Sequence, residues 1–130
     1  MDTQAVVDKI LKHLWDQERV STSSYAKGCA YRGRDGTKCA IGILIPEEVY
    51  LSEMEGKGFN TICSIFKEVR DLPEIQALRV DHPIHGPLGR ALQRLHDNLF
   101  LVGNFREKLR ERAETCIRDY GLTVNLPKEE

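Results

Sequence analysis

The chain has 130 residues and a formal net charge of −1, and 41% of its residues are hydrophobic. This length allows one domain that can fold without disulfides or a metal. The balance of 19 basic against 20 acidic side chains excludes the overall positive field of a protein that binds nucleic acid or membranes non-specifically.

The first segment, MDTQAVVDKILKHLWDQ, predicts an amphipathic helix over residues 3–18. Val6, Ile10 and Leu14 recur at four-residue steps, and acids and lysines lie between them. These charges argue against a signal peptide and against a membrane span, so we expect a protein of the cytoplasm. The four cysteines, at positions 29, 39, 63 and 116, are then expected to be reduced thiols.

The second segment, CAYRGRDGTKCAIG at residues 29–42, predicts a β-hairpin. Its composition is typical of a type I turn that ends in a left-handed glycine, here Gly36. In this register Tyr31 pairs with Cys39 and faces inward, while Arg32 and Lys38 face outward. A two-residue turn centred on Asp35 and Gly36 is the alternative, and it would mix polar and apolar side chains on both faces.

Helices account for most of the remaining chain. Asn60 is expected to cap a helix of about ten residues whose inward face includes Ile65, and Pro73 begins a short one. A leucine stripe predicts a helix from about residue 88 to 99. Asn104 and Glu107 resemble a capping box for the last helix, and Gly121 ends it as a left-handed cap.

These elements predict a single small α+β domain, mostly helical, with one β-hairpin near the N-terminus. The domain is expected to cover residues 1–124, and residues 125–130 are expected to form a polar C-terminal tail.

Cysteine and histidine residues suggest one metal hypothesis and one thiol hypothesis. A closed zinc site could use four ligands, Cys29, Cys39, His82 and His85, although neither pair has the short spacing of a zinc knuckle. The alternative is that the two cysteines face an apolar core. A catalytic thiol would need a neighbour that lowers its pKa, such as Lys38 or a histidine from elsewhere. We therefore predict no cofactor.

His96 and Asp97 are candidates for acid–base chemistry or for an HD-type metal site. They are neighbours on a predicted helix and point about 100° apart, so they are not expected to form a hydrogen-bonded dyad. The alternative is a histidine satisfied by the backbone beside a solvated aspartate.

A cationic cluster lies on or beside the predicted hairpin, and Tyr31 is adjacent to it. Its members are Lys27, Arg32, Arg34 and Lys38. Arginine side chains placed in this way can bind phosphate or carboxylate groups. The alternative is a solvated hairpin face, which the acidic residues that follow, such as Glu47, could neutralise.

The segments CAYRGRDGTKCAIGILIPEEVY (29–50) and ALQRLHDNL (91–99) resemble the motifs of a family of small uncharacterised proteins from tailed bacteriophages and prophages. Arg34 and Ile43 depart from the family pattern. The resemblance implies a phage accessory protein in the bacterial host cytoplasm, but it implies no activity. The positions it singles out are Cys29, Tyr31, Arg32, Gly33, Asp35, Gly36, Lys38, Cys39, Gly42, Pro46, Gln93, His96 and Asp97.

The leading functional hypothesis is a non-enzymatic protein that binds and modulates a host or defence component through the cationic hairpin. The target could also be a nucleotide or nucleic acid, and homodimerisation through Trp15 or Phe100 stays open. The alternatives are an enzyme acting on nucleotides or phosphodiesters with His96 and Asp97 at its site, and a zinc-stabilised structural module. The expected contact residues are Tyr31, Arg32, Arg34, Asp35, Lys38, Gln93, His96 and Asp97.

Overall fold

The computed structural model of the chain describes residues 2–22, 30–79, 87–99 and 103–127. Its helices are α1 (Thr3–Gln17), α2 (Phe59–Ile65), α3 (Lys67–Arg70), α4 (Pro73–Ala77), α5 (Pro87–Asp97) and α6 (Phe105–Ile117). Four short 3₁₀ turns accompany them: η1 (Arg34–Gly36), η2 (Gly42–Leu44), η3 (Ser52–Met54) and η4 (Arg118–Tyr120).

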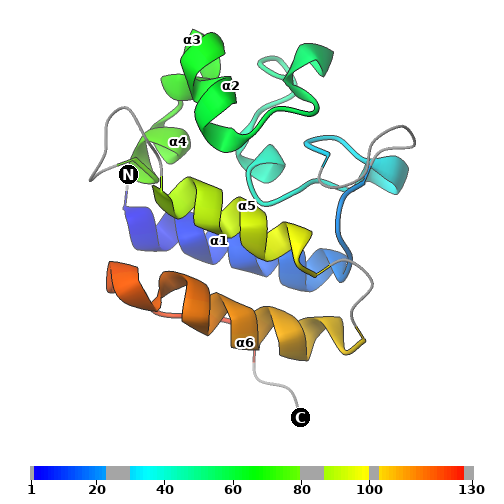
Figure 1. Cartoon of the computed structure of the whole chain (residues 1–130), viewed down its shortest axis with the longest axis vertical. Coiled ribbons are helices and arrows are strands. Elements are labelled where there is room, and N and C mark those ends of the chain that lie inside the picture. Colours follow the sequence, from blue (N-terminus) through cyan, green and yellow to red (C-terminus); the bar gives the residue numbers. More distant parts are fainter. Residues whose placement is uncertain (1, 23–29, 80–86, 100–102, 128–130) are drawn as a thin grey trace.

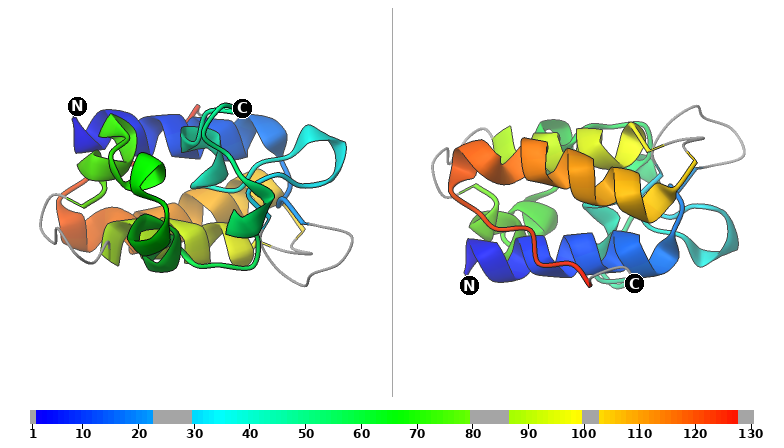
Figure 2. Two further views of the ribbon diagram at one scale, coloured as in Figure 1. Left: turned by 90° about the horizontal axis from the view of Figure 1, so that it is seen from above. Right: turned by 90° about the horizontal axis from the view of Figure 1, so that it is seen from below.

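The molecule has two tiers (Figure 1). The long helices α1, α5 and α6 form the lower tier, and the loop segment 30–58 with the short helices α2, α3 and α4 forms the upper one. The views from above and below show the same grouping (Figure 2). No helix in the described part of the chain combines the length and apolarity that a membrane-spanning segment needs.

The expected α+β fold is wrong, because the described residues contain no β-strand and the fold is all-α. In the described part of the predicted hairpin, residues 30–42, the turn forms together with one backbone hydrogen bond beside it, from the Gly33 N–H to the Thr37 carbonyl at 2.9 Å. Asp35 and Gly36 both adopt left-handed backbone conformations, with φ of 58° and 75°, and the Thr37 N–H donates to the Arg34 carbonyl. This geometry matches the two-residue turn that the sequence offered as the alternative.

Side chains from distant elements replace the missing strand ladder. The N–H groups of Tyr31 and Arg32 donate to the Glu55 carboxylate at 2.9 and 3.0 Å. Gln17 accepts from the Lys38 N–H at 2.9 Å. Buried backbone groups need partners of some kind, and here a carboxylate and an amide supply them. Local hairpin propensity therefore did not decide the structure of this segment.

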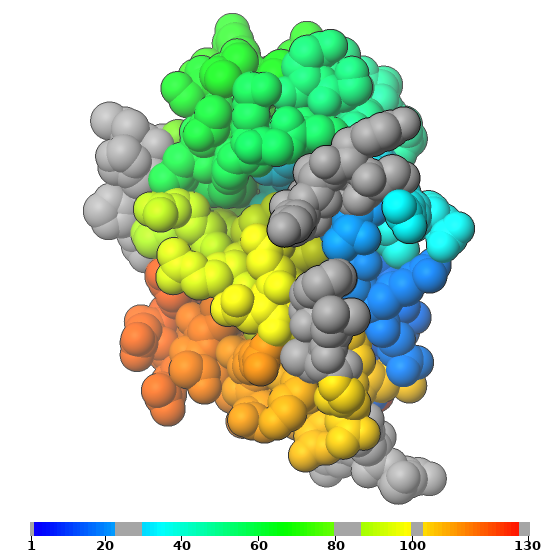
Figure 3. All heavy atoms as spheres, turned by 45° about the vertical axis from the view of Figure 1, so that its right-hand side comes forward, coloured from blue at the N-terminus to red at the C-terminus, as the bar shows by residue number. Residues whose placement is uncertain are grey.

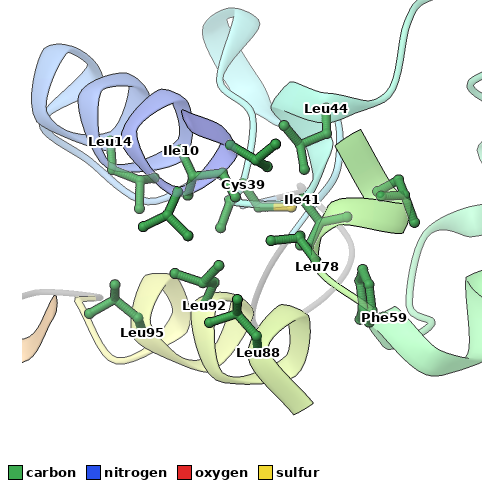
Figure 4. Packing of buried hydrophobic residues seen from close by; sticks show 14 of the residues in the cluster. Ile10, Leu14, Cys39, Ile41, Leu44, Phe59, Leu78, Leu88, Leu92 and Leu95 are labelled. Atoms are coloured by element: carbon green, nitrogen blue, oxygen red, sulfur yellow. The ribbon is translucent and has the colours of Figure 1, made fainter. Parts of the chain in front are cut away.

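The segment of residues 30–42 lies between α1 and α5 (Figure 4). Cys39, Ile41 and Leu44 project into the space between the two helices and are almost fully buried. Residues in this position contact apolar side chains on both sides, which a solvent-facing hairpin could not do. The fold is thus closed by a loop inserted between two helices.

The three long helices occur where the amphipathic stripes in the sequence predicted them. Asp2 caps α1 by accepting the Gln4 N–H at 3.1 Å, and the leucines of α5 are buried as expected. The prediction of a capping box at the start of α6 is wrong, however. Asn104 is left-handed there, with φ of 54°, and its side chain makes no capping hydrogen bond, because a capping residue needs an extended backbone.

The predicted helix around residues 60–69 is broken into α2 and α3. Gly58 rather than Asn60 precedes the first helix, and Phe66 has extended backbone angles that separate the two. The break changes the direction of the chain, and Ile65, which was expected to face inward, is 57% exposed.

Gly89 sets the distance between the two tiers. A Cβ atom at this position would lie 2.6 Å from the ring of Phe59, so α5 can approach α2 only without a side chain there. Phe59 is almost fully buried in this contact.

The C-terminal segment that follows Gly121 runs along α1 and α6 (Figure 2). The side-chain amide of Gln4 donates to the Thr123 carbonyl at 2.8 Å and accepts the Thr123 N–H at 2.9 Å. The alternate residues Leu122, Val124 and Leu126 pack against the core. The described part of the segment is therefore docked on the domain.

Candidate functional site

The Arg32 side chain lies mostly inside the structure, where it ties three stretches of backbone together. Its guanidinium donates to the carbonyls of Tyr31, Gly42 and Ile45 at 3.1, 2.8 and 2.5 Å and to the Glu47 carboxylate at 2.9 Å. The side chain is only 16% exposed. Four acceptors within the same chain already use this guanidinium, so it has a structural role.

The neighbouring groups complete this interior site. Tyr50 contacts the Arg32 guanidinium, with its ring centroid at 4.7 Å, and donates its hydroxyl to Glu55 at 2.6 Å. Burial and the adjacent Glu55 carboxylate raise the pKa of Tyr50, so the phenol keeps its proton. Tyr31 is buried as well, and its hydroxyl donates to the Lys57 carbonyl.

His96 holds the chain that follows α1 from within the core. It is fully buried, its Nε2 accepts the backbone N–H of Ser21 at 2.8 Å, and its Nδ1 lies 3.1 Å from the Asp97 carboxylate. The expectation that His96 and Asp97 would not contact each other is wrong, although the alternative of a histidine satisfied by the backbone describes Nε2 correctly. The hydroxyl of Ser21 instead accepts from Thr37 at 3.2 Å, so the Ser21–His96–Asp97 group has no nucleophile–base contact.

Gln93 lies one turn before His96 and contacts the loop residues at the centre of the core. Its amide donates to the Cys39 thiol at 3.3 Å, and its carbonyl accepts the Ile41 N–H at 3.4 Å. The Gly42 N–H also donates to Cys39. A Cβ atom on Gly42 would lie 2.4 Å from the Tyr31 carbonyl, so the glycine permits a close approach of two backbones.

The structure therefore brings the two motif segments together, chiefly by burying them against each other. Tyr31, Gln93 and His96 are in the interior, and Arg32 is nearly so. The remaining expected contact residues lie at or near the surface: Arg34, Asp35, Lys38 and Asp97.

Acidic side chains lie beside Lys38 of the cationic cluster and beside Arg19, which is close to the turn. Asp35 lies 3.5 Å from Arg19, and Lys38 lies 3.7 Å from the same Glu47 oxygen that binds Arg32. The fourth cation of the cluster, Lys27, is outside the described residues. Exposed ion pairs of this kind contribute about 0–1 kcal/mol to stability, but they reduce the positive field that a phosphate group would meet.

The metal hypothesis rests mainly on residues outside the described part of the chain, namely Cys29, His82 and His85. The fourth residue, Cys39, is buried and accepts hydrogen bonds from an amide and a backbone N–H. Among the described residues, no group of three or more potential ligands lies close enough to hold a metal ion.

His13 lies beside the same loop and shares its environment with His96. Its Nε2 is 2.8 Å from the Lys38 carbonyl, which accepts from it. Desolvation lowers the pKa of His13; the hydrogen bond to Lys38 opposes this, and the nearby His96 and Lys38 add to it. The neutral imidazole is thus the form that the folded structure favours.

The upper tier has an exposed apolar surface that no pattern in the sequence predicted. Leu51 and Ile65 are 49% and 57% exposed, and they line one hollow of about 230 Å³. We call this surface the Leu51–Ile65 face; it is completed by Val49, Met54, Phe66, Lys67 and Glu68. The helical periodicity predicted a buried Ile65, and only the break at Phe66 turns it outward.

The Leu51–Ile65 face is surrounded by acidic sequence. Residues 46–71 carry six acidic and three basic side chains, whereas the whole chain is close to neutral. Glu48, Glu53 and Glu68 are exposed. The hollow itself is lined by one cation, Lys67, and one anion, Glu68, so the negative balance comes from the rest of this segment.

Comparison of the chain with protein-family models, curated proteins and solved structures finds no match, so the function has to be argued from the site itself.

Proposed function

We propose that this chain is a non-enzymatic binding protein of a phage or prophage, which acts by occupying a host protein through its Leu51–Ile65 face. The carrying observation is that Leu51 and Ile65 are both about half exposed and line the same hollow. Large aliphatic side chains grouped in this way are typical of protein-interaction surfaces. The phage context depends only on the resemblance of residues 29–50 and 91–99.

The geometry favours this surface over the cationic turn. Arg32 donates to three carbonyls and Glu47, and Lys38 is close to the same carboxylate. Recruiting Arg32 to a ligand would break several internal hydrogen bonds, each worth about 0.5–1.5 kcal/mol, or more with a charged donor. The proposed main contact surface is therefore the Leu51–Ile65 face and not the cationic turn.

The geometry also argues against His96 as a catalytic base. Its Nε2 already accepts a backbone N–H inside the core, and a base must reach the proton that it removes. The enzyme alternative would therefore need another residue in that role.

Charge complementarity defines the partner. An acidic surround favours a protein segment that presents apolar side chains among lysines or arginines, such as one face of a basic amphipathic helix. A second copy of this chain, docked face to face, would instead place like charges together. The proposed occupant is therefore a basic segment of a different protein.

The test is affinity capture from phage-infected cells with the tagged chain and three variants. The double variant Leu51→Glu, Ile65→Glu should lose the captured partner, because it places charge at the centre of the contact. Tyr120→Glu is the matched control, since Tyr120 is the third exposed large hydrophobic side chain among the described residues and lies outside the face; it should keep the partner.

The third variant, Arg34→Ala, Lys38→Ala, separates the two surfaces. Loss of the partner in this variant alone would show that the cationic turn is the contact surface. Retention of the partner by the Leu51→Glu, Ile65→Glu variant, with its thermal unfolding unchanged, would contradict the proposal. A captured protein should also bind as a purified fragment, through a basic and apolar segment.

A further inference from the structure

A second hollow lies between α5 and α6, away from the Leu51–Ile65 face. The two helices lie side by side on one face of the molecule, α5 in yellow and α6 in orange (Figure 3). Each helix contributes a stripe at helical spacing to this hollow, which we call the α5–α6 groove. The lining residues are Ala91, Arg94 and Leu95 from α5 with Asn98 directly after it, and Glu111, Arg112, Thr115 and Cys116 from α6.

Short side chains keep the groove open. Ala91, Thr115 and Cys116 occupy positions where longer side chains would fill the space between the helices. The hollow measures about 490 Å³, within the range of roughly 300–1,000 Å³ of small-molecule sites in proteins. Leu95 and Cys116 supply an apolar lining.

Two arginines and one glutamate give the groove a positive balance. Arg112 donates to the Asn98 carbonyl and so links α6 to the end of α5. Glu111 lies 3.6 Å from Lys108, which partly neutralises it. Arg94 is exposed, and it has no hydrogen-bond or ion-pair acceptor among the described residues.

From this arrangement we infer that the α5–α6 groove binds a small organic anion, a carboxylate or a phosphate monoester, with a compact apolar body. The planar Arg94 guanidinium can donate two parallel hydrogen bonds to either anionic group. The apolar body would then lie against Leu95 and Cys116. This site is independent of the Leu51–Ile65 face.

The Cys116 thiol lines the groove rather than reacting in it. Burial raises its pKa to about 11, against a smaller opposite effect of Arg94. The neutral thiol thus contributes apolar surface. It also provides a reporter, because a bound ligand should shield it from alkylation.

Calorimetric titration of the purified chain tests the inference with three probes of similar size. Phenyl phosphate and benzoate should both bind saturably, and the tighter of the two identifies the anionic group. Benzyl alcohol, which has the same ring without a charge, should bind at least about tenfold more weakly, because its neutral hydroxyl cannot form a bidentate ion pair with Arg94.

Matched variants locate the site. Arg94→Gln should weaken anion binding by about tenfold or more, whereas Arg90→Gln should change it by less than about twofold. Arg90 is an exposed arginine one turn earlier on the same helix, and it does not line the groove. Thr115→Phe, which fills the groove without changing the charge, should abolish binding.

Alkylation of Cys116, followed by peptide mass spectrometry, gives a readout at the groove itself. Saturating phenyl phosphate or benzoate should slow it in the wild-type chain and leave it unchanged in Arg94→Gln. The inference is overturned if neither anion binds, if benzyl alcohol binds equally well, if Arg90→Gln weakens binding as much as Arg94→Gln, or if the anions bind without protecting Cys116.

Discussion

At the scale of single residues, the environment decides how deeply a charged side chain is buried. Arg32 and Arg34 are two positions apart in one motif. Arg32 is held by three carbonyls and Glu47, whereas Arg34 is exposed on the turn. Both arginines belong to the same cationic cluster in the sequence, and the sequence alone predicts the same binding role for both. The hydrogen-bond demand of nearby carbonyls, which comes from the tertiary fold, separates them.

His13 belongs to the same interior, and it makes stability depend on pH. Its folded-state pKa lies below the ordinary value of about 6.5. As the pH falls below that value, the unfolded chain therefore binds more protons at this position than the folded chain does. The free energy of unfolding decreases on acidification as a result. We expect His13→Gln, which keeps an N–H donor for the Lys38 carbonyl, to make stability less dependent on pH between about 7.5 and 5.5.

Urea unfolding at both pH values measures this effect. The difference between the two midpoints in each protein removes contributions that do not depend on pH. Equal differences in the wild-type chain and in His13→Gln would show that another group causes the acid sensitivity.

At the scale of elements, one helix break and one close contact shape the upper tier and its packing on α5. The break at Phe66 turns α3 away from α2 and exposes Ile65, while Gly89 lets the Phe59 ring lie directly against α5. Neither feature has a clear local signal, because a glycine in a helix normally lowers helix stability. Gly89 makes sense only with Phe59 beside it.

Gly89→Ala should therefore destabilise the protein although alanine is the better helix former. The gain in helix propensity is about 1 kcal/mol, whereas overpacking a filled core costs about 1–3 kcal/mol. We expect a net loss of about 1 kcal/mol, measured by urea unfolding. Gly103→Ala is the control, because a Cβ atom there meets no neighbour within 4 Å; a similar loss in both variants would exclude the Phe59 contact as the cause.

At the scale of the whole molecule, residues far apart in the chain join α1 to the segment that follows Gly121. Gln4 near the N-terminus binds both backbone groups of Thr123, and Asp8 accepts from Asn125 at 3.1 Å. Leu122, Val124 and Leu126 add apolar contacts. The C-terminal segment is thereby part of the domain as far as the structure describes it.

Replacing Gln4 by Met should release this segment while keeping the size of the side chain. Hydrogen exchange at the Thr123 amide should become faster, and global stability should fall by about 1 kcal/mol. Lys12→Met, an exposed change on the same helix, should leave exchange at Thr123 unaltered. Unchanged exchange in Gln4→Met would mean that the apolar contacts alone hold the segment.

The candidate sites were only partly visible from the sequence. The sequence motifs contain residues that matter for the fold, since Arg32 and Gln93 hold the loop and His96 holds the backbone of Ser21. The sequence alone predicted a binding role for them, because a motif does not show whether its polar groups face a ligand or the backbone. The Leu51–Ile65 face and the α5–α6 groove were missed, because both depend on how separate elements meet.

The sequence by itself determined the three long helices, the left-handed Gly36 and the left-handed cap at Gly121, since helical periodicity and glycine turns are local properties. The tertiary structure alone decided that residues 30–42 form a loop between α1 and α5 instead of a hairpin. Its backbone groups could be paired either by a neighbouring strand or by Gln17, Glu55 and Gln93. Only packing of the whole chain brought those side chains within reach.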